Sequence, residues 1–385
     1  MYIFICKMAY LKQLGNRCEF GTDGFCKNST VAIEGDLAAT AFFGTNEPYV
    51  KLWNLQSGNC FQTIKAEKVL SVAIYNGIIA LVNESKEIKV YNCYTGECLK
   101  TLNDMKTLGN TSMTAESIAI GGNTGSERVI CTTRYDSYKW SRGKDIISGT
   151  DMTEEINGII QVWDLNGIPN SDEKILPIHE APHRGVKLVA IDGNRFITAS
   201  SGELYIWDTK TCKRIGRVRL SLYVWSIAIN GDKIVTAEGW GTTGDSVVKI
   251  FEYDRTNNVI NDPNVYNHDY VCSVAIDENV IVSGSPKGWY RTGGTVKIYD
   301  RDGNQQMTLK DTSDENKYAS LSVAVGGGHI MTGYKPNIVQ IFDYVKDRSG
   351  NYSIKNETRQ VHTTNCEPDK TCETPGSCKF AQLKL

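Results

Sequence analysis

One pattern of hydrophobic and polar positions recurs along the chain. Two branched aliphatic residues flank a polar residue, an aromatic residue follows, and most copies end in a polar residue and a turn. This alternation is typical of a short β-strand that ends in a turn. The copies are VKLWNLQSG ending at Gly58, IKVYNCYTG ending at Gly96, IQVWDLNG ending at Gly167, LYIWDTKT from Leu204, VKIFEYD from Val248, VKIYDRDG from Val296 and VQIFDY from Val339.

A second pattern precedes each copy. It is a short segment close to VAI with a small central residue, followed by a turn and another apolar run. Alanine at its centre suits a strand that packs tightly near a crowded axis. The central alanines are Ala32, Ala73, Ala119, Ala190, Ala228, Ala275 and Ala324, and the aromatic positions that follow them are Trp53, Tyr91, Trp163, Trp207, Phe251, Tyr299 and Phe342.

Paired signatures at a regular spacing predict a ring of similar units. Most successive aromatic positions lie 38 to 48 residues apart, the period of a blade with four short strands. One such sheet cannot bury its own hydrophobic faces, whereas sheets stacked around an axis cover one another. We therefore expect an all-β fold, a seven-bladed β-propeller with four antiparallel strands per blade. The competing fold is a β-sandwich, which would not repeat both signatures in order.

The spacing also divides the chain. Tyr91 and Trp163 are 72 positions apart, so the third unit carries an inserted loop. The predicted parts are an N-terminal segment at 1–27, the propeller at 28–360 with an insertion at about 134–157, and a Cys-rich tail at 361–385.

Two segments compete to complete the last blade. Residues Ala9 to Leu14 (AYLKQL) are similar to the outer-strand segment CLKTL, which makes the N-terminal segment a candidate ring-closing strand. Residues Tyr352 to Val361 fit the same position. If the C-terminal segment takes it, the N-terminal one packs elsewhere.

Several copies resemble a known family. VKLWNLQSGNCFQTI, IKVYNCYTGECLKTL and LYIWDTKTCKRIGRV resemble the third and fourth strands of WD-repeat blades, and Trp163-Asp164 and Trp207-Asp208 supply the dipeptide itself. The resemblance covers roughly residues 28–360 and implies a propeller that binds proteins. No copy opens with the Gly-His pair usual in that family, so its buried His-Asp network is not expected. SVAIDENVIVSGSPKGWYRTGGTVKIYDRDG is also similar to FG-GAP repeats, but no loop supplies the alternating carboxylates of their calcium sites.

Composition narrows the classes of partner. Hydrophobic residues make up 41% of the chain and charged residues 22%, which suits a globular protein with a large core. A net charge of -2 gives no basic field for nucleic acid or anionic lipid. No run approaches the roughly 20 apolar residues that cross a bilayer, and no signal peptide is evident, so we expect no membrane insertion and a cytoplasmic location.

Residues that carry chemistry do not form a catalytic constellation. Ser283-Gly284-Ser285 ends a predicted strand, and the glycines from Gly326 to Gly328 lie in a turn. Asp192, Asp232 and Asp277 occupy equivalent turns, which indicates turn-making. We predict no enzyme activity, no cofactor and no metal ion.

Cysteine is concentrated at the two ends. Ring closure should bring these ends together, so disulfides are candidates and would imply an oxidising compartment. Zinc held by His362 with the C-terminal cysteines, and reduced thiols in a cytosolic protein, are the alternatives. We expect Cys60, Cys98 and Cys212 each to begin an outer strand at the same repeat position. The candidate disulfide residues are Cys18, Cys26, Cys366, Cys372 and Cys378.

Aromatic and basic residues gather on one predicted rim of the disc. Loops between second and third strands emerge there, together with the segments that enter the first strands. Aromatic residues and arginine on rigid loops are typical of protein-binding hot spots. The predicted partner-binding residues are Trp140, Arg142, Trp240, Lys287, Trp289, Tyr290, Arg291, Tyr334, Lys335, Tyr223, Trp225 and Tyr270.

The leading hypothesis is a non-catalytic protein-protein interaction scaffold that binds partners through this rim. The alternative is a structural component of a large multi-subunit assembly, such as a particle coat or surface layer, pinned by its Cys-rich termini. A propeller enzyme with residues converging in the axial channel is the third hypothesis.

Overall fold

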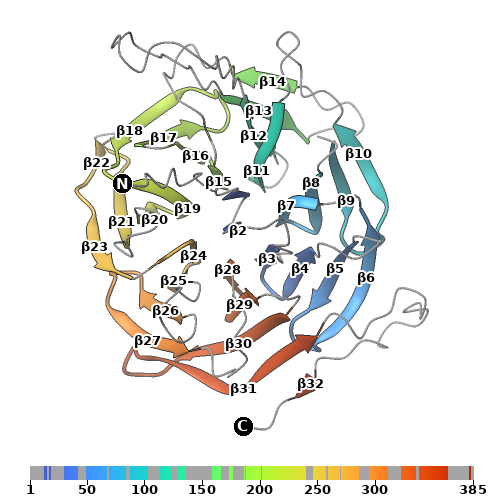
Figure 1. Ribbon diagram of the computed structural model, residues 1–385, viewed down its shortest axis with the longest axis vertical. Helices are drawn as coiled ribbons and strands as arrows, with labels where there is room; N and C mark the ends of the chain where they lie inside the picture. The colour runs from blue at the N-terminus through green and yellow to red at the C-terminus, as the bar shows by residue number, and fades with distance from the viewer. Residues whose placement is uncertain are drawn as a thin grey trace, which may run out of the picture.

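The fold is a ring of β-sheets. The computed structural model describes residues 13–14, 17–18, 30–41, 49–66, 69–83, 87–102, 113–122, 128–135, 158–165, 173–176, 186, 188–200, 202–239, 246–256, 259–268, 270–285, 295–310, 322–334, 338–362 and 381–382. Sheets radiate from a common centre, and the chain passes once around the ring (Figure 1). The all-β propeller with four antiparallel strands per blade is confirmed.

Each blade is built from consecutive strands. The innermost strands are β3 (Thr30–Glu34), β7 (Val69–Tyr75), β11 (Met113–Gly121), β15 (Leu188–Asp192), β19 (Tyr223–Asn230), β24 (Ser273–Ile276) and β28 (Ser322–Gly326). The second strands are β4 (Leu37–Ala41), β8 (Ile78–Asn83), β12 (Arg128–Tyr135), β16 (Arg195–Ser200), β20 (Lys233–Gly239), β25 (Val280–Ser285) and β29 (His329–Tyr334). The third strands are β5 (Tyr49–Asn54), β9 (Ile88–Asn92), β13 (Gly158–Asp164), β17 (Glu203–Asp208), β21 (Ser246–Asp254), β26 (Thr295–Asp300) and β30 (Ile338–Lys346). The outer strands are β6 (Asn59–Lys65), β10 (Cys98–Leu102), β14 (Glu173–Leu176), β18 (Arg214–Arg219), β22 (Val259–Ile260) with β23 (Asn264–Asn267), β27 (Gln305–Lys310) and β31 (Tyr352–His362).

The two chain ends take different places. β31 pairs antiparallel with β30, so the C-terminal segment supplies the outer strand of the last sheet. A short strand, β32 (Ala381–Gln382), adds to its edge. Near the N-terminus, β1 (Gln13–Leu14) pairs with β2 (Arg17–Cys18) and lies against β11.

Sheets are held together by apolar side chains from both sides of each junction. Every innermost strand contacts the innermost strand of the next sheet, and β28 contacts β3, which closes the ring. At this closure Trp53, 2% exposed, packs with Ala324, Met331 and Ile341 of the last sheet. Because each sheet is covered on both faces, β5 is buried at every position except its last.

The repeated aromatic-polar dipeptide has two separate roles. The indole nitrogens donate hydrogen bonds to threonine hydroxyls of the neighbouring second strand, at 2.9 Å from Trp53 to Thr40 and at 2.9 Å from Trp207 to Thr198. The following Asp208 accepts the backbone N–H of Thr211 at 2.7 Å and so shapes the turn to the outer strand. The dipeptide therefore fixes the third strand and its turn together.

That turn ends in a left-handed residue. Gly58 and Gly96 have φ values of 71° and 70°, and each donates its N–H to the residue four positions earlier. Cys212 does the same with φ 56°, so it takes the glycine position of the turn. The expectation that Cys212 begins an outer strand like Cys60 and Cys98 is wrong. The turn starts at Asp208 and reaches its left-handed residue four positions later at Cys212, so the outer strand β18 begins only at Arg214.

A serine hydroxyl ties innermost strands of neighbouring sheets together. Ser71 Oγ accepts the N–H of Ile118 at 3.4 Å, and Ser273 Oγ accepts that of Val323 at 3.1 Å. Both serines are fully buried. These bonds pair a donor in one blade with an acceptor in the previous blade, which fixes the blades' relative height.

The disc has two unlike faces. We call the face with the first-to-second-strand and third-to-fourth-strand turns the turn face, and the opposite one the loop face. On the turn face polar bonds cross the blade junctions, and the predicted turn residues take part. Asp192 accepts the N–H of Gly231 at 2.6 Å, Asp232 pairs with Arg195 at 2.8 Å, and Asp277 accepts the hydroxyl of Tyr344 at 2.6 Å.

Candidate functional site

The predicted rim corresponds to the loop face, where three of its aromatic residues are described. Tyr223 is 43% exposed, and its ring lies 6.3 Å from that of the partly buried Trp225. Tyr270 adopts a φ of 56°. Tyr334 is the last residue of β29, and its side chain is not described. Outside the described residues lie Trp140, Arg142, Trp240, Lys287, Trp289, Tyr290, Arg291 and Lys335.

The candidate disulfide residues fall at the ends of the chain. Cys18 ends β2, whereas Cys26, Cys366, Cys372 and Cys378 lie outside the described residues. The cysteines whose side chains are described hold thiols: Cys60, Cys93, Cys98, Cys212 and Cys272. Burial raises the pKa of the Cys93 thiol to about 12, so this thiol stays protonated at neutral pH.

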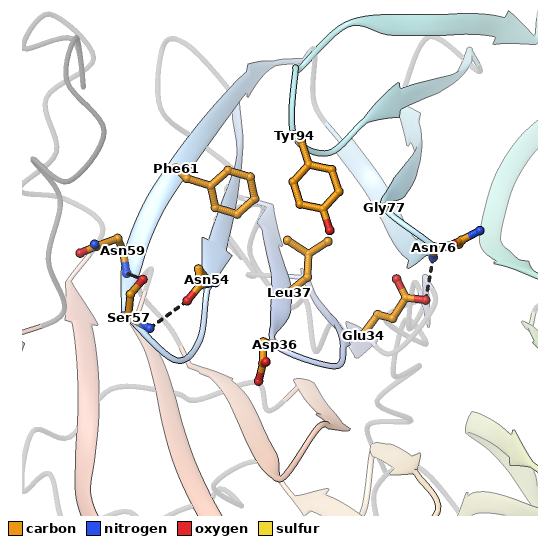
Figure 2. Close-up of a pocket in the computed structure, with 10 residues that line it drawn as sticks. All are labelled: Glu34, Asp36, Leu37, Asn54, Ser57, Asn59, Phe61, Asn76, Gly77 and Tyr94. Carbon is orange, nitrogen blue, oxygen red and sulfur yellow. Dashed lines mark hydrogen bonds between the residues drawn. The ribbon is translucent and has the colours of Figure 1, made fainter.

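A pocket opens on the turn face, between the sheet β3 to β6 and the sheet β7 to β10. Its volume is about 670 Å³. Figure 2 shows aromatic rings along one side, carboxylates on another and Leu37 between them. The lining residues are Glu34, Asp36, Leu37, Asn54, Ser57, Asn59, Phe61, Asn76, Gly77 and Tyr94.

The aromatic side of the pocket is a stacked pair. The rings of Phe61 and Tyr94 lie 6.1 Å apart at an angle of 23°. Tyr94 is 67% exposed and sits in the turn after β9, where its N–H binds the side chain of Asn92 at 2.9 Å. Gly77 lies beneath it, because a Cβ at Gly77 would come within 2.9 Å of the tyrosine ring. The turn and the glycine together hold the tyrosine ring over the pocket.

The acidic side is anchored across two junctions. Glu34 Oε1 accepts the N–H of Asn76 at 2.6 Å, which joins the first two sheets. Asp36 accepts from Gln56 at 2.6 Å and lies 3.3 Å from Nε2 of His329 in the last sheet. The other nitrogen of His329 is 2.7 Å from Asp343. Both carboxylates are thus positioned by neighbouring blades.

These groups define what the pocket can bind. The ten lining residues contain two carboxylates and no lysine, arginine or histidine. Carboxylates beside an exposed aromatic face attract cations. In the part of the chain that the structure describes, no cluster of three or more His, Cys, Asp or Glu side chains is arranged around a metal position. Nor does that part contain a helix long and apolar enough to span a membrane.

Sequence reasoning missed this pocket. Its residues come from two blades and from turns that were interpreted as structural. Tyr94 carried the clearest signal, since a large aromatic residue in a short polar turn has little to pack against locally.

Comparisons with known proteins support the fold. No protein-family profile and no curated protein matches the chain. Among solved structures, the computationally designed Ika8 protein is similar with a TM-score of 0.52 and 15% sequence identity. The match covers 91% of this chain and 96% of that one. This similarity shows a common fold and leaves function to be argued from the chain's own residues.

Proposed function

We propose that the chain is a non-catalytic scaffold that binds other proteins through the faces of its propeller. The observation that carries this proposal is the open pocket on the turn face, with the exposed Tyr94 stacked on Phe61 above two carboxylates. Aromatic residues held on rigid turns bury much area at small entropy cost, which favours protein binding. The pocket also straddles two blades, so a partner would engage a preformed surface.

The loop face is the second surface in this proposal. Tyr223 and Trp225 give it a described aromatic pair. Trp140, Trp240 and Trp289 are further partner contacts that the sequence predicts for this face. Because the two faces point in opposite directions, one propeller can hold two partners without steric conflict.

We further propose seven blades of the WD-repeat kind. In support, the sheets with four or more strands begin at β3, β7, β11, β15, β19, β24 and β28. Trp207-Asp208 forms both hydrogen bonds expected of an anchor and a turn-making residue. At the entry to blade six, the ring nitrogens of the buried His268 lie 2.7 Å from the hydroxyl of Ser283 and 2.9 Å from that of Thr295.

The scaffold proposal is tested by affinity purification of the tagged full chain after mild crosslinking. The parent is compared with a loop-face variant, Trp140→Ala, Trp240→Ala and Trp289→Ala, and with a turn-face variant, Tyr94→Ala. Circular dichroism checks that each variant is folded. Partners retained by the parent and lost from one folded variant support the proposal and identify the face. Identical partner sets for all three proteins contradict it.

A further inference from the structure

We infer that the pocket between the first two sheets binds an arginine side chain from an extended segment of a partner protein. The inference rests on the proposed scaffold function and specifies the chemistry of one contact. Three features of the pocket carry it: its charge, its aromatic side and its size.

The charge favours a cationic guest. Glu34 is the last residue of β3 and Asp36 lies in the turn that follows it, and no basic residue is among the ten that line the pocket. Glu34 uses Oε1 to accept the N–H of Asn76. A carboxylate offers about four acceptor positions on two oxygens, so Glu34 retains capacity for donors from a ligand. A guanidinium group supplies such donors in a planar fork.

The aromatic pair selects arginine over lysine. Tyr94 is 67% exposed and stacked on Phe61, which holds its ring in place. A planar guanidinium group stacks on such a ring while its N–H groups point sideways toward carboxylates. An ammonium group is a compact, strongly hydrated charge and gains less from this arrangement.

The pocket's size and the polar groups along one side favour a peptide over a free small cation as the ligand. The pocket volume of about 670 Å³ exceeds the needs of one guanidinium group and lies within the usual range for bound ligands. On the side opposite Glu34, Asn54 Oδ1 accepts the N–H of Ser57 at 2.8 Å and Ser57 Oγ accepts that of Asn59 at 3.4 Å, which leaves the Ser57 hydroxyl and the amide NH₂ groups to act as donors (Figure 2). Such groups form hydrogen bonds with the main chain of an extended segment.

The test titrates the full chain with acetyl-Gly-Arg-Gly-amide, followed by saturation-transfer NMR and calorimetry. Matched peptides carry citrulline, which keeps the shape and loses the charge, or lysine, which keeps the charge and loses the plane. We expect the arginine peptide to bind about tenfold more tightly than the citrulline peptide and about threefold more tightly than the lysine peptide.

Variants locate the binding site. Glu34→Gln keeps an acceptor for the N–H of Asn76 and should weaken arginine binding about fivefold. Tyr94→Leu, at an exposed position, should weaken it about threefold. The matched controls are Glu252→Gln on β21 and Tyr266→Leu on β23, neither of which lines the pocket, and both should leave affinity unchanged. Thermal melting verifies that every variant is folded.

Each outcome decides the inference. Selective binding of arginine that both pocket variants weaken supports it. Equal binding of arginine and citrulline peptides, no binding of either, or equal loss in the control variants overturns it. Methyl glucoside serves as a neutral sugar probe, and its binding in place of arginine would also overturn the inference. Partner capture in the affinity purification is measured separately, so the scaffold proposal can stand when the arginine site fails.

Discussion

The hydroxyl oxygen of Ser273 accepts a hydrogen bond from the backbone nitrogen of Val323, 3.1 Å away and 50 positions further along the chain. Removing a partner of a buried N–H leaves its desolvation uncompensated, which costs about 1–3 kcal/mol. Ser273→Ala should therefore lower the free energy of unfolding by about that amount in urea titrations. Ser349→Ala, at an exposed turn, is the control and should change stability by less than about 0.5 kcal/mol. Equal effects of the two substitutions would argue against a role for the hydroxyl at the blade junction.

The ring closure makes a second prediction. Gly327 and Gly35 both have left-handed backbones, with φ values of 59° and 55°. A Cβ at Gly327 would lie 2.5 Å from the carbonyl oxygen of Gly35, whereas a Cβ at Gly35 meets nothing within 4 Å.

Gly35→Ala should cost about 1 kcal/mol through its backbone alone. Gly327→Ala should cost more, because the last sheet must also move away from the first. Differential scanning calorimetry of the two variants measures the difference. A Gly35→Ala variant as unstable as Gly327→Ala would show that backbone conformation, and not contact between blades, sets the cost.

A buried ion pair in the β19 to β23 sheet makes a third prediction. Lys249 Nζ lies 2.7 Å from Glu238 Oε2, whose carboxylate is fully buried and also accepts the hydroxyl of Thr236 at 2.6 Å. Lys249→Met leaves that buried carboxylate without its counter-charge and should lower the free energy of unfolding by about 3–5 kcal/mol.

The double variant Glu238→Leu, Lys249→Met removes both charges and should recover much of this loss. Urea titrations of the two single variants and the double variant form a thermodynamic cycle. Additive losses in that cycle would contradict a direct coupling of the two residues.

The buried His268 makes stability depend on pH. Desolvation, with a smaller effect of Lys297, lowers its pKa from 6.5 to about 3. The folded protein therefore keeps the ring neutral where the unfolded chain binds a proton. The stabilising contribution is complete above pH about 6.5 and is lost as the pH falls toward about 3.

Between these values the parent should lose about 1.4 kcal/mol per pH unit more than His268→Gln does. Urea titrations at several pH values, run on both proteins, give the two slopes. Because the remaining carboxylates titrate in both proteins, only the difference reports on His268. Parallel slopes would mean that the ring is protonated in the folded state.

Local periodicity was sufficient to predict a propeller with four antiparallel strands per blade. Trp53 and Trp207 lie in third strands and Ala32 and Ala324 in innermost strands, because strand alternation and turn chemistry are encoded within about ten residues. Cys212 shows the limit of this reasoning. It follows its tryptophan by five positions, whereas Cys60 and Cys98 follow their aromatic residues by seven, and the backbone of the turn puts it in the left-handed position before the outer strand.

Contacts between blades were much harder to predict. The pocket depends on how Glu34 of one sheet approaches Asn76 of the next, and no local pattern encodes that distance. Likewise, a serine precedes several of the VAI segments in the sequence. Its hydrogen bond to the next blade could not be predicted, because it depends on how far the neighbouring innermost strand is shifted along the ring axis. The polar contacts of the turn face depend on how neighbouring sheets pack, and the hydrophobic periodicity of the sequence carries no information about that packing.

His329 links the closing junction to the candidate site, since it lies against Asp36, which lines the pocket. Three sheets therefore position the groups of one pocket, and the third of these sheets comes last in the chain. A nascent or partly assembled ring presents the tyrosine ring and Glu34 without the support that orients Asp36. Opening the ring between the first and last blades would therefore remove a contact that orients one of the two pocket carboxylates, without touching the pocket itself.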